Sequence, residues 1–187
     1  ELYLGMRFLD VALSSFIYQM DGSVSPFGTD GAVMYFHPAQ LGGLYKENRI
    51  LVNRGYLHMV FHCIFRHFGK PGIEKRLWNL SCDIAVEHMI DGIYHRSVRY
   101  SRSLLRRETY RLLEKEKKTL NAERIYKILK EEFLKEKELA QLEKEFYVDD
   151  HKYWANQQPD RKPNPLMSKK WGDISEGIET DLETFSR

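Results

Sequence analysis

The chain has 187 residues, of which 29 are basic and 27 acidic, so its formal net charge at pH 7 is only +2. This length suits one domain, or one domain with an appendage, and the near balance of charge gives no reason to expect a nucleic acid or an anionic membrane as a partner. No apolar run approaches the ~20 residues that a membrane span requires. Two cysteines and no leader-like start favour a soluble protein in a reducing cytoplasm.

The first quarter of the chain predicts a helix, a strand and a second, short helix. Apolar residues in 2–20 recur three and four positions apart, which is the spacing of an amphipathic helix. Residues 21–31 contain the Asp-Gly and Ser-Pro pairs typical of turns. Residues 32–36 are a short β-prone run, and Pro38 suits the first turn of a short helix that reaches Tyr45.

Two long apolar helices are predicted in the middle of the chain. The first spans about 48–68 and stops at Gly69 and Pro71, and the second spans about 73–91, with Gly92 placed to end it. Because only a short turn joins them, we expect the two helices to pack antiparallel at the centre of the domain.

Beyond Tyr100, charged residues of both signs alternate with apolar ones. With Asn121 as an N-cap, the pattern predicts two or three amphipathic helices that cover the core. Mixed-sign runs of this kind are usually solvated helix faces, which argues against a nucleic-acid role. Residues 157–165 have the composition of a loop or linker. We therefore expect a domain over 1–150, followed over 151–187 by a linker and the start of a C-terminal helical segment.

Two histidines four positions apart lie inside the first central helix. His58 and His62 project from one face, because a helix turns about 100° per residue, and their spacing is that of the HExxH zinc helix. Two satisfied core histidines are the ordinary alternative, but an unpaired imidazole in an apolar helix is costly and a metal ion would satisfy it. Asp83 on the second helix is the expected third ligand, since a buried aspartate also needs a partner.

Met59 stands where the HExxH helix has its glutamate. That glutamate is the general base that takes a proton from metal-bound water, and a thioether cannot replace it. Glu87, one turn after Asp83 on the same face, is the candidate catalytic carboxylate, either polarising bound water or ligating the metal directly. An ordinary surface or capping carboxylate is an equal alternative for Glu87.

Four further residues are weaker candidates for the site. His67 lies nine positions after His58, half a turn off that face unless the helix ends early. Cys63 and Cys82 are each one position from an expected ligand and are expected to be buried free thiols. His151, which two aspartates precede, could fold back from a distant loop over an open metal position.

The order of these pieces resembles a known family. The pieces are Thr29-Asp30-Gly31, Met34-Tyr35-Phe36-His37-Pro38, His58-x-x-x-His62 with His67, Trp78-Asn79 with Asp83, and Arg124-Ile125-Tyr126. Together, over roughly residues 2–135, they resemble the metallopeptidase domain found upstream of a von Willebrand factor A-like domain in bacterial proteins.

The resemblance implies a zincin-like α+β fold, mostly helical with a small sheet, and zinc held by His58, His62 and Asp83. It also implies a peptide or protein substrate and a partner among the AAA+ ATPases of the MoxR type. Because that family usually has glutamate where this chain has Met59, we expect a metallopeptidase-like zinc-binding domain with impaired catalysis, a pseudoenzyme. The alternative is a non-catalytic metal-binding or scaffold module that partners such an ATPase.

Overall fold

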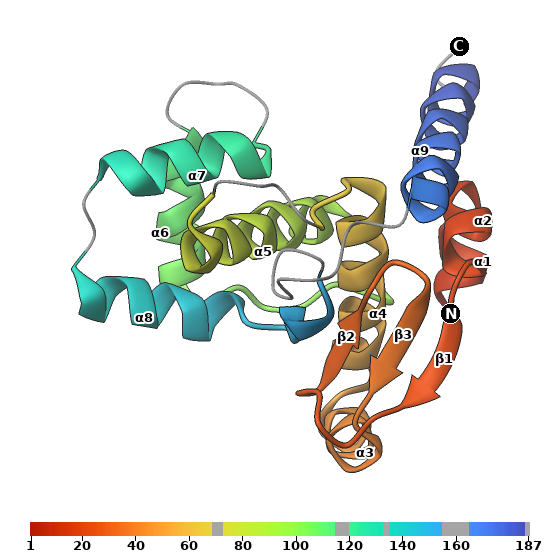
Figure 1. The fold of residues 1–187 in the computed structure, drawn as a ribbon, viewed down its shortest axis with the longest axis horizontal. Coiled ribbons are helices and arrows are strands. Elements are labelled where there is room, and N and C mark those ends of the chain that lie inside the picture. Colours follow the sequence, from red (N-terminus) through yellow and green to blue (C-terminus); the bar gives the residue numbers. More distant parts are fainter. Residues whose placement is uncertain (69–72, 115–119, 133–134, 155–164, 186–187) are drawn as a thin grey trace.

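The computed structural model describes residues 1–68, 73–114, 120–132, 135–154 and 165–185. These residues form a mostly helical domain with one small sheet, so the predicted α+β class is confirmed (Figure 1). In chain order the elements are α1 (Leu2–Gly5), η1 (Arg7–Leu9), α2 (Asp10–Leu13), β1 (Ile17–Met20), β2 (Phe27–Thr29), β3 (Val33–Phe36), α3 (Pro38–Glu47), α4 (Arg49–Ile64), α5 (Lys75–Gly92), α6 (Leu104–Leu113), α7 (Ala122–Glu131), α8 (Glu136–Phe146), η3 (His151–Tyr153) and α9 (Pro165–Phe185).

The prediction of one helix over residues 2–20 is wrong. The chain instead forms the short elements α1, η1 and α2 and then the strand β1. Ser14 and Ser15 lie between α2 and β1, and their hydroxyls donate to the carbonyls of Asp10 and Val11 at 2.8 and 2.6 Å. Such side-chain bonds compete with continuation of a helix. Ile17 then donates its backbone N–H across the sheet, so pairing with a distant strand overrides the local helical spacing.

The three strands have the spatial order β1-β3-β2. β3, which is the strand predicted over 32–36, lies in the middle, parallel to β1 and antiparallel to β2. Gly55 lets α4 approach the sheet closely, because a Cβ at this position would lie only 2.4 Å from Cε2 of Phe27 on β2. The sheet therefore packs directly on the helix that carries the two histidines (Figure 1).

Helices α4 and α5 are the predicted central pair and are in contact at the middle of the molecule, but they cross there and do not lie alongside each other as the expected antiparallel packing requires (Figure 1). Asn48 caps α4 by accepting the N–H of Ile50 at 2.9 Å. The helix ends at Ile64, earlier than predicted, because Phe65 is its C-cap and Arg66 adopts a left-handed φ of 54°. One apolar core lies around α4 and the N-terminal elements, and a second lies between α5 and helices α6, α7 and α8.

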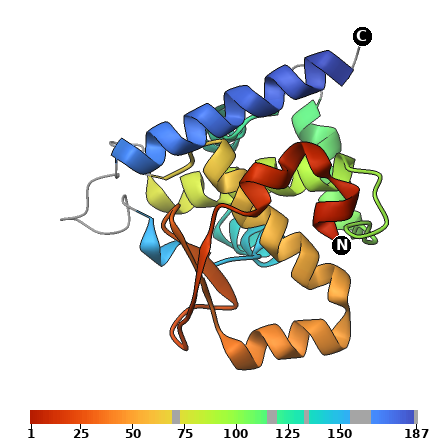
Figure 2. The ribbon, with the colours of Figure 1, turned by 90° about the vertical axis from the view of Figure 1, so that its right-hand side faces the viewer.

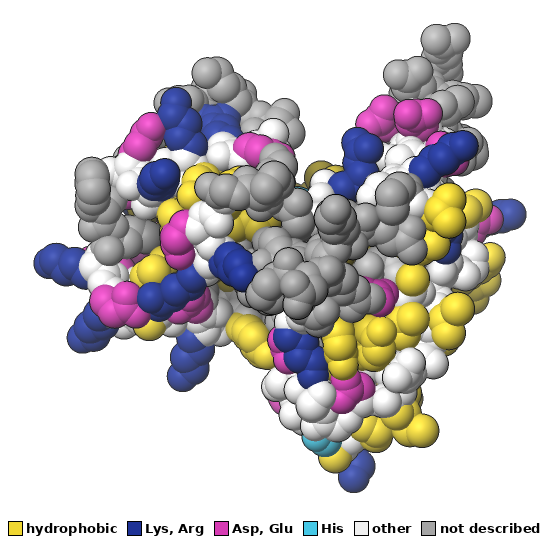
Figure 3. All heavy atoms as spheres, in the orientation of Figure 1, with side chains coloured by type: hydrophobic (Ala, Val, Ile, Leu, Met, Phe, Trp, Pro, Cys, Tyr) yellow, Lys and Arg dark blue, Asp and Glu magenta, His cyan; other side chains and the backbone are white. Residues whose placement is uncertain are grey.

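Helices α6, α7 and α8 cover α5, as predicted for the charged region. Asn121 caps α7 by accepting the N–H of Arg124 at 3.0 Å, and Ile125 and Leu142 are among the residues that these helices bury. Basic and acidic side chains are interspersed over α7 and α8 in Figure 3, which is typical of solvated helix faces.

Helix α9 packs on the rest of the domain beside α4 and the N-terminal elements (Figure 2). Trp171 is 2% exposed and donates its Nε1–H to the carbonyl of Gly31 at 2.7 Å. Most of the predicted linker, residues 155–164, lies outside the described residues, so the domain boundary at residue 150 stays a prediction. Among the helices described, none combines the length and the apolar character needed to cross a membrane.

Candidate metal centre

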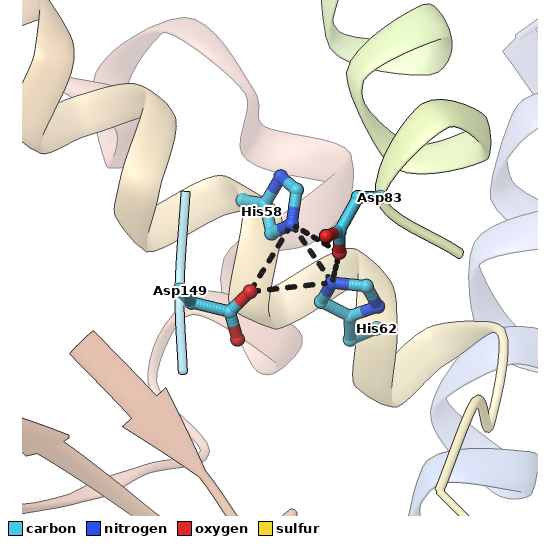
Figure 4. A group of neighbouring side chains, drawn as sticks. All are labelled: His58, His62, Asp83 and Asp149. Carbon is cyan, nitrogen blue, oxygen red and sulfur yellow. Dashed lines mark hydrogen bonds and ion pairs between the residues drawn. The ribbon is translucent and has the colours of Figure 1, made fainter. Parts of the chain in front are cut away.

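Helix α4 brings His58 and His62 together, as their spacing predicts. Both side chains are completely buried, and their Nε2 atoms lie 2.8 Å apart. The face that carries them is directed at α5 and at the segment between α8 and η3 (Figure 4).

Asp83 and Asp149 complete a group of four. Asp83 comes from α5 and Asp149 from the segment after α8, and one ligand atom of each of the four residues lies within 4.8 Å of all the others (Figure 4). Oδ1 of Asp83 is 3.5 and 3.3 Å from Nε2 of His58 and His62. Oδ1 of Asp149 is 3.4 and 3.7 Å from the same two nitrogen atoms.

These separations fit a single metal ion. Two ligands of a tetrahedral zinc ion with bonds of about 2.0–2.2 Å lie about 3.3–3.6 Å apart. The four nitrogen-to-oxygen distances, from 3.3 to 3.7 Å, are close to that value, and only the 2.8 Å between the two Nε2 atoms is shorter. Nitrogen and oxygen donors of this kind are ligands that zinc accepts in proteins.

Four buried polar atoms in and beside the group make no hydrogen bond among the described residues. Oδ1 of Asp83, both carboxylate oxygens of Asp149 and Nε2 of His151 are buried and make no hydrogen bond of acceptable geometry among the described residues. Leaving such groups unpaired is expensive. A cation between them would satisfy them, so the unpaired atoms are a second observation that fits a metal ion.

His151 does fold back over the site, although sequence spacing gave little reason to expect it. Its Nε2 lies 3.0 Å from Oδ1 of Asp83 and 3.0 Å from Oδ1 of Asp149. Burial alone would lower the pKa of His151, but the two carboxylates raise it to about 10. The pair of carboxylates therefore attracts positive charge strongly, whether the charge is an imidazolium or a metal ion.

Each histidine of the pair has a second partner on its Nδ1. Oε1 of Glu87 lies 2.9 Å from Nδ1 of His58, and Nδ1 of His67 lies 2.9 Å from Nδ1 of His62. Partners of this kind fix the tautomer of a ligating histidine and direct its other nitrogen at the metal. A ring that donates its Nδ1–H to such a partner keeps its Nε2 lone pair for the group of four.

The carboxylate of Glu87 accepts hydrogen bonds from three neighbouring side chains. Besides His58, its Oε2 accepts hydrogen bonds from Arg54 at 2.5 Å and from Arg106 at 2.6 Å. Burial would raise the pKa of this carboxyl, but the hydrogen bond from His58 and the charge of Arg54 hold it well below its usual value. Glu87 is thus an ionised carboxylate on the Nδ1 side of His58, not on the Nε2 side where the four ligand atoms meet.

Met59 is fully buried and belongs to the apolar core around α4. The position that carries the general base in an HExxH helix therefore contributes a thioether to that core. The two cysteines next to the expected ligands are free and buried, as predicted.

A cavity of about 360 Å³ borders the group of four on one side. Asp83, Asp149 and His151 lie in its wall, and the remaining lining residues are Arg76, Asn79, Leu80, Glu143, Tyr147, Asp150 and Lys152. The cavity therefore connects the carboxylate side of the centre with the surface between α5 and α8.

Sequence reasoning brought together His58, His62 and Asp83 but missed Asp149. Helical periodicity relates residues within one or two turns, whereas Asp149 follows α8 and reaches the centre only through the packing of α8 on α5. The one available signal was the Asp149-Asp150-His151 string, which is rich in metal-binding side chains.

A family model described as "Putative metallopeptidase domain" matches residues 7–185. No curated protein and no solved structure matches the chain significantly. The match covers almost the whole chain, including the residues that supply all four members of the group. The chain therefore belongs to this metallopeptidase-domain family.

Proposed function

We propose that this domain binds one zinc ion through His58, His62, Asp83 and Asp149, and that the ion stabilises a scaffold and does not hydrolyse peptides. The observation that carries the proposal is the convergence of four buried donors from α4, α5 and the segment after α8. Three of these donors are the ligands that the sequence predicts, and the fourth comes from the fold.

The site does not meet two requirements of zinc-dependent hydrolysis, and this argues against a catalytic role. A catalytic zinc site usually has three protein ligands and leaves the fourth position to water, whose pKa the ion lowers. Here Asp149 would be a fourth protein ligand, since its Oδ1 lies 3.4 and 3.7 Å from the two Nε2 atoms, and a tetrahedral site would then have no position for water. The glutamate that takes the proton from such a water in an HExxH helix is replaced here by Met59, which cannot accept a proton.

Glu87 is a positioning residue in this proposal and not a catalytic one. Its carboxylate accepts the Nδ1–H of His58 and so directs the Nε2 lone pair of that ring at the ion. Arg54 and Arg106 hold the carboxylate in place from the other side and balance its charge.

Peptide hydrolysis is the second candidate, and the cavity beside the centre is the observation that favours it. A bound peptide could approach from this cavity if Asp149 turned away from the histidines, because Asp149 and His151 form part of the cavity wall. His151 would then face both the substrate and the remaining ligands.

Metal analysis together with peptidase assays separates the two candidates. We expect the purified protein to hold one zinc ion per chain and His58→Ala to hold none, with circular dichroism to verify that the variant is folded. We expect the zinc-loaded protein to leave a broad peptide library intact. Zinc-dependent cleavage that His58→Ala abolishes would refute the scaffold role, and a parent protein without metal affinity would refute the metal centre itself.

A scaffold also requires a partner. The resemblance in sequence points to an AAA+ ATPase of the MoxR type, and co-purification with such an ATPase, with and without zinc, tests this part of the proposal.

A further inference from the structure

The turn that follows α4 returns His67 to the histidine pair. A regular helix would carry His67 half a turn away from the face of His58. Instead the helix ends at Ile64, Arg66 takes a left-handed φ of 54°, and the N–H of His67 donates to the carbonyl of His62 at 3.1 Å. His67 becomes 4% exposed as a result.

Trp78 of α5 and His62 of α4 hold His67 in this place. Nε1–H of Trp78 donates to the backbone carbonyl of His67 at 3.1 Å, and the two rings meet edge to face with their centroids 6.1 Å apart. The imidazole of His67 also lies edge to face with that of His62, at 5.1 Å between centroids. The ring is thus fixed both along the chain and across the contact of α4 with α5.

The 2.9 Å contact between the Nδ1 atoms of His62 and His67 needs one proton, and its position decides what His62 can do. If His62 donates, its Nε2 keeps a free lone pair toward Asp83 and Asp149. If His67 donates, His62 carries its proton on Nε2 and cannot bind a metal there. His62 can therefore serve as a ligand only where the Nδ1 of His67 is the acceptor of this contact.

We propose that His67 is a positioning residue of the metal centre: its Nδ1 accepts the Nδ1–H of His62 and holds His62 in the tautomer whose Nε2 faces the ion. This proposal rests on the proposed zinc site. It adds a hydrogen-bond partner for His62 that differs in charge from the partner of His58. The partner of His58 is a carboxylate, while the partner of His62 is a neutral imidazole. An anionic partner makes a ligating histidine more basic, so the two ligands differ in donor strength.

Two substitutions at position 67 separate positioning from packing. His67→Leu keeps an apolar side chain of similar bulk and removes the acceptor, whereas His67→Asn keeps an acceptor close to the place of Nδ1. We expect His67→Leu to weaken zinc binding by about 10- to 100-fold, the usual effect of losing such a partner. We expect His67→Asn to bind within about threefold of the parent. His88→Leu, at a partly exposed histidine of α5 that contacts Glu114, is the matched control and should bind like the parent.

Zinc affinity is measured by competition with a chromogenic chelator, and the thermal stability of each metal-free protein is measured beside it. The tautomer of His62 is read from the ¹⁵N shifts of its ring nitrogens in the zinc-loaded parent and variants. Equal zinc affinities of parent and His67→Leu would overturn the proposal and leave the zinc site standing. Equal losses in His67→Leu and His67→Asn, in step with lower metal-free stability, would show packing alone and also overturn it. A parent that binds no zinc would instead refute the proposed function.

Discussion

Replacing Asp149 by alanine removes the donor that closes the centre. At free zinc 100 times the Kd, zinc stabilises the parent protein by about 2.7 kcal/mol. Loss of a residue that only hydrogen-bonds to a metal ligand weakens metal binding by about 10- to 100-fold. Asp149 is itself one of the four donors, so its loss should weaken binding by at least as much. With a Kd raised about 100-fold, the same zinc concentration stabilises the variant by only about 0.4 kcal/mol. About 1 kcal/mol shifts the Tm of a chain of this size by about 2–4 °C, so zinc should raise Tm by about 5–11 °C in the parent and about 1–2 °C in Asp149→Ala.

The assay is thermal unfolding of each protein with excess chelator and with buffered zinc. Asp150→Ala is the matched control, because the neighbouring carboxylate accepts the N–H of Lys152 at 3.0 Å and is not one of the four converging donors. Zinc should raise the Tm of Asp150→Ala by as much as it raises the Tm of the parent protein. In the cobalt-substituted proteins, acetohydroxamate should change the visible absorption of Asp149→Ala, where a position is open, but not that of the parent. The reasoning would be refuted if zinc raised the Tm of Asp149→Ala as much as that of the parent and acetohydroxamate left the visible absorption of its cobalt form unchanged.

Three further predictions follow from contacts around the centre and at α9. Glu87→Gln should weaken zinc binding by about tenfold, because the charge that holds His58 is lost, and chelator competition showing no change would contradict this. Trp171→Ala should lower the free energy of unfolding, measured by urea denaturation, by about 3–5 kcal/mol, because the side chain is buried. Replacing the exposed Leu166 by alanine is the control and should change the same quantity by less than about 0.5 kcal/mol. A small effect of Trp171→Ala would mean that α9 is not part of the folded unit. In the metal-free protein the pKa of His151 is raised to about 10, so its stabilising effect is complete below pH ~6.5 and is lost as pH rises toward 10. Urea midpoints that fall from pH 6.5 to pH 10 in the parent, but not in His151→Ala, would agree with this sign.

Local patterns predicted the elements that local physics controls. The capping residues Asn48 and Asn121 mark the starts of α4 and α7, and the i, i+4 histidine pair needs only regular helix geometry to converge. Asp83 could be predicted because a buried carboxylate in an apolar helix needs a partner.

The failures involve contacts between distant segments. The spacing of apolar residues in 2–20 is helical, yet β1 forms because β3 offers a pairing edge. His67 and Asp149 reach the centre through a left-handed Arg66 and through the path of the chain after α8, and neither feature has a periodic signature. The spacing of residues in the sequence cannot predict where a side chain lies when its location depends on one residue with positive φ or on how one helix packs against another.

The location of Asp149 has a consequence for chain topology. An ion shared by His58 and Asp149 closes a loop of 149 − 58 = 91 residues, in a domain whose two cysteines are both free thiols. In the chain-entropy model, a covalent cross-link around a loop of about 100 residues restricts the unfolded chain by about 4.7 kcal/mol. A bound ion would therefore restrict the unfolded chain as a disulfide does, without requiring an oxidant. While Asp149 ligated such an ion, the segment after α8 could not move away from the centre, so the rate of metal exchange would limit how often that segment opens.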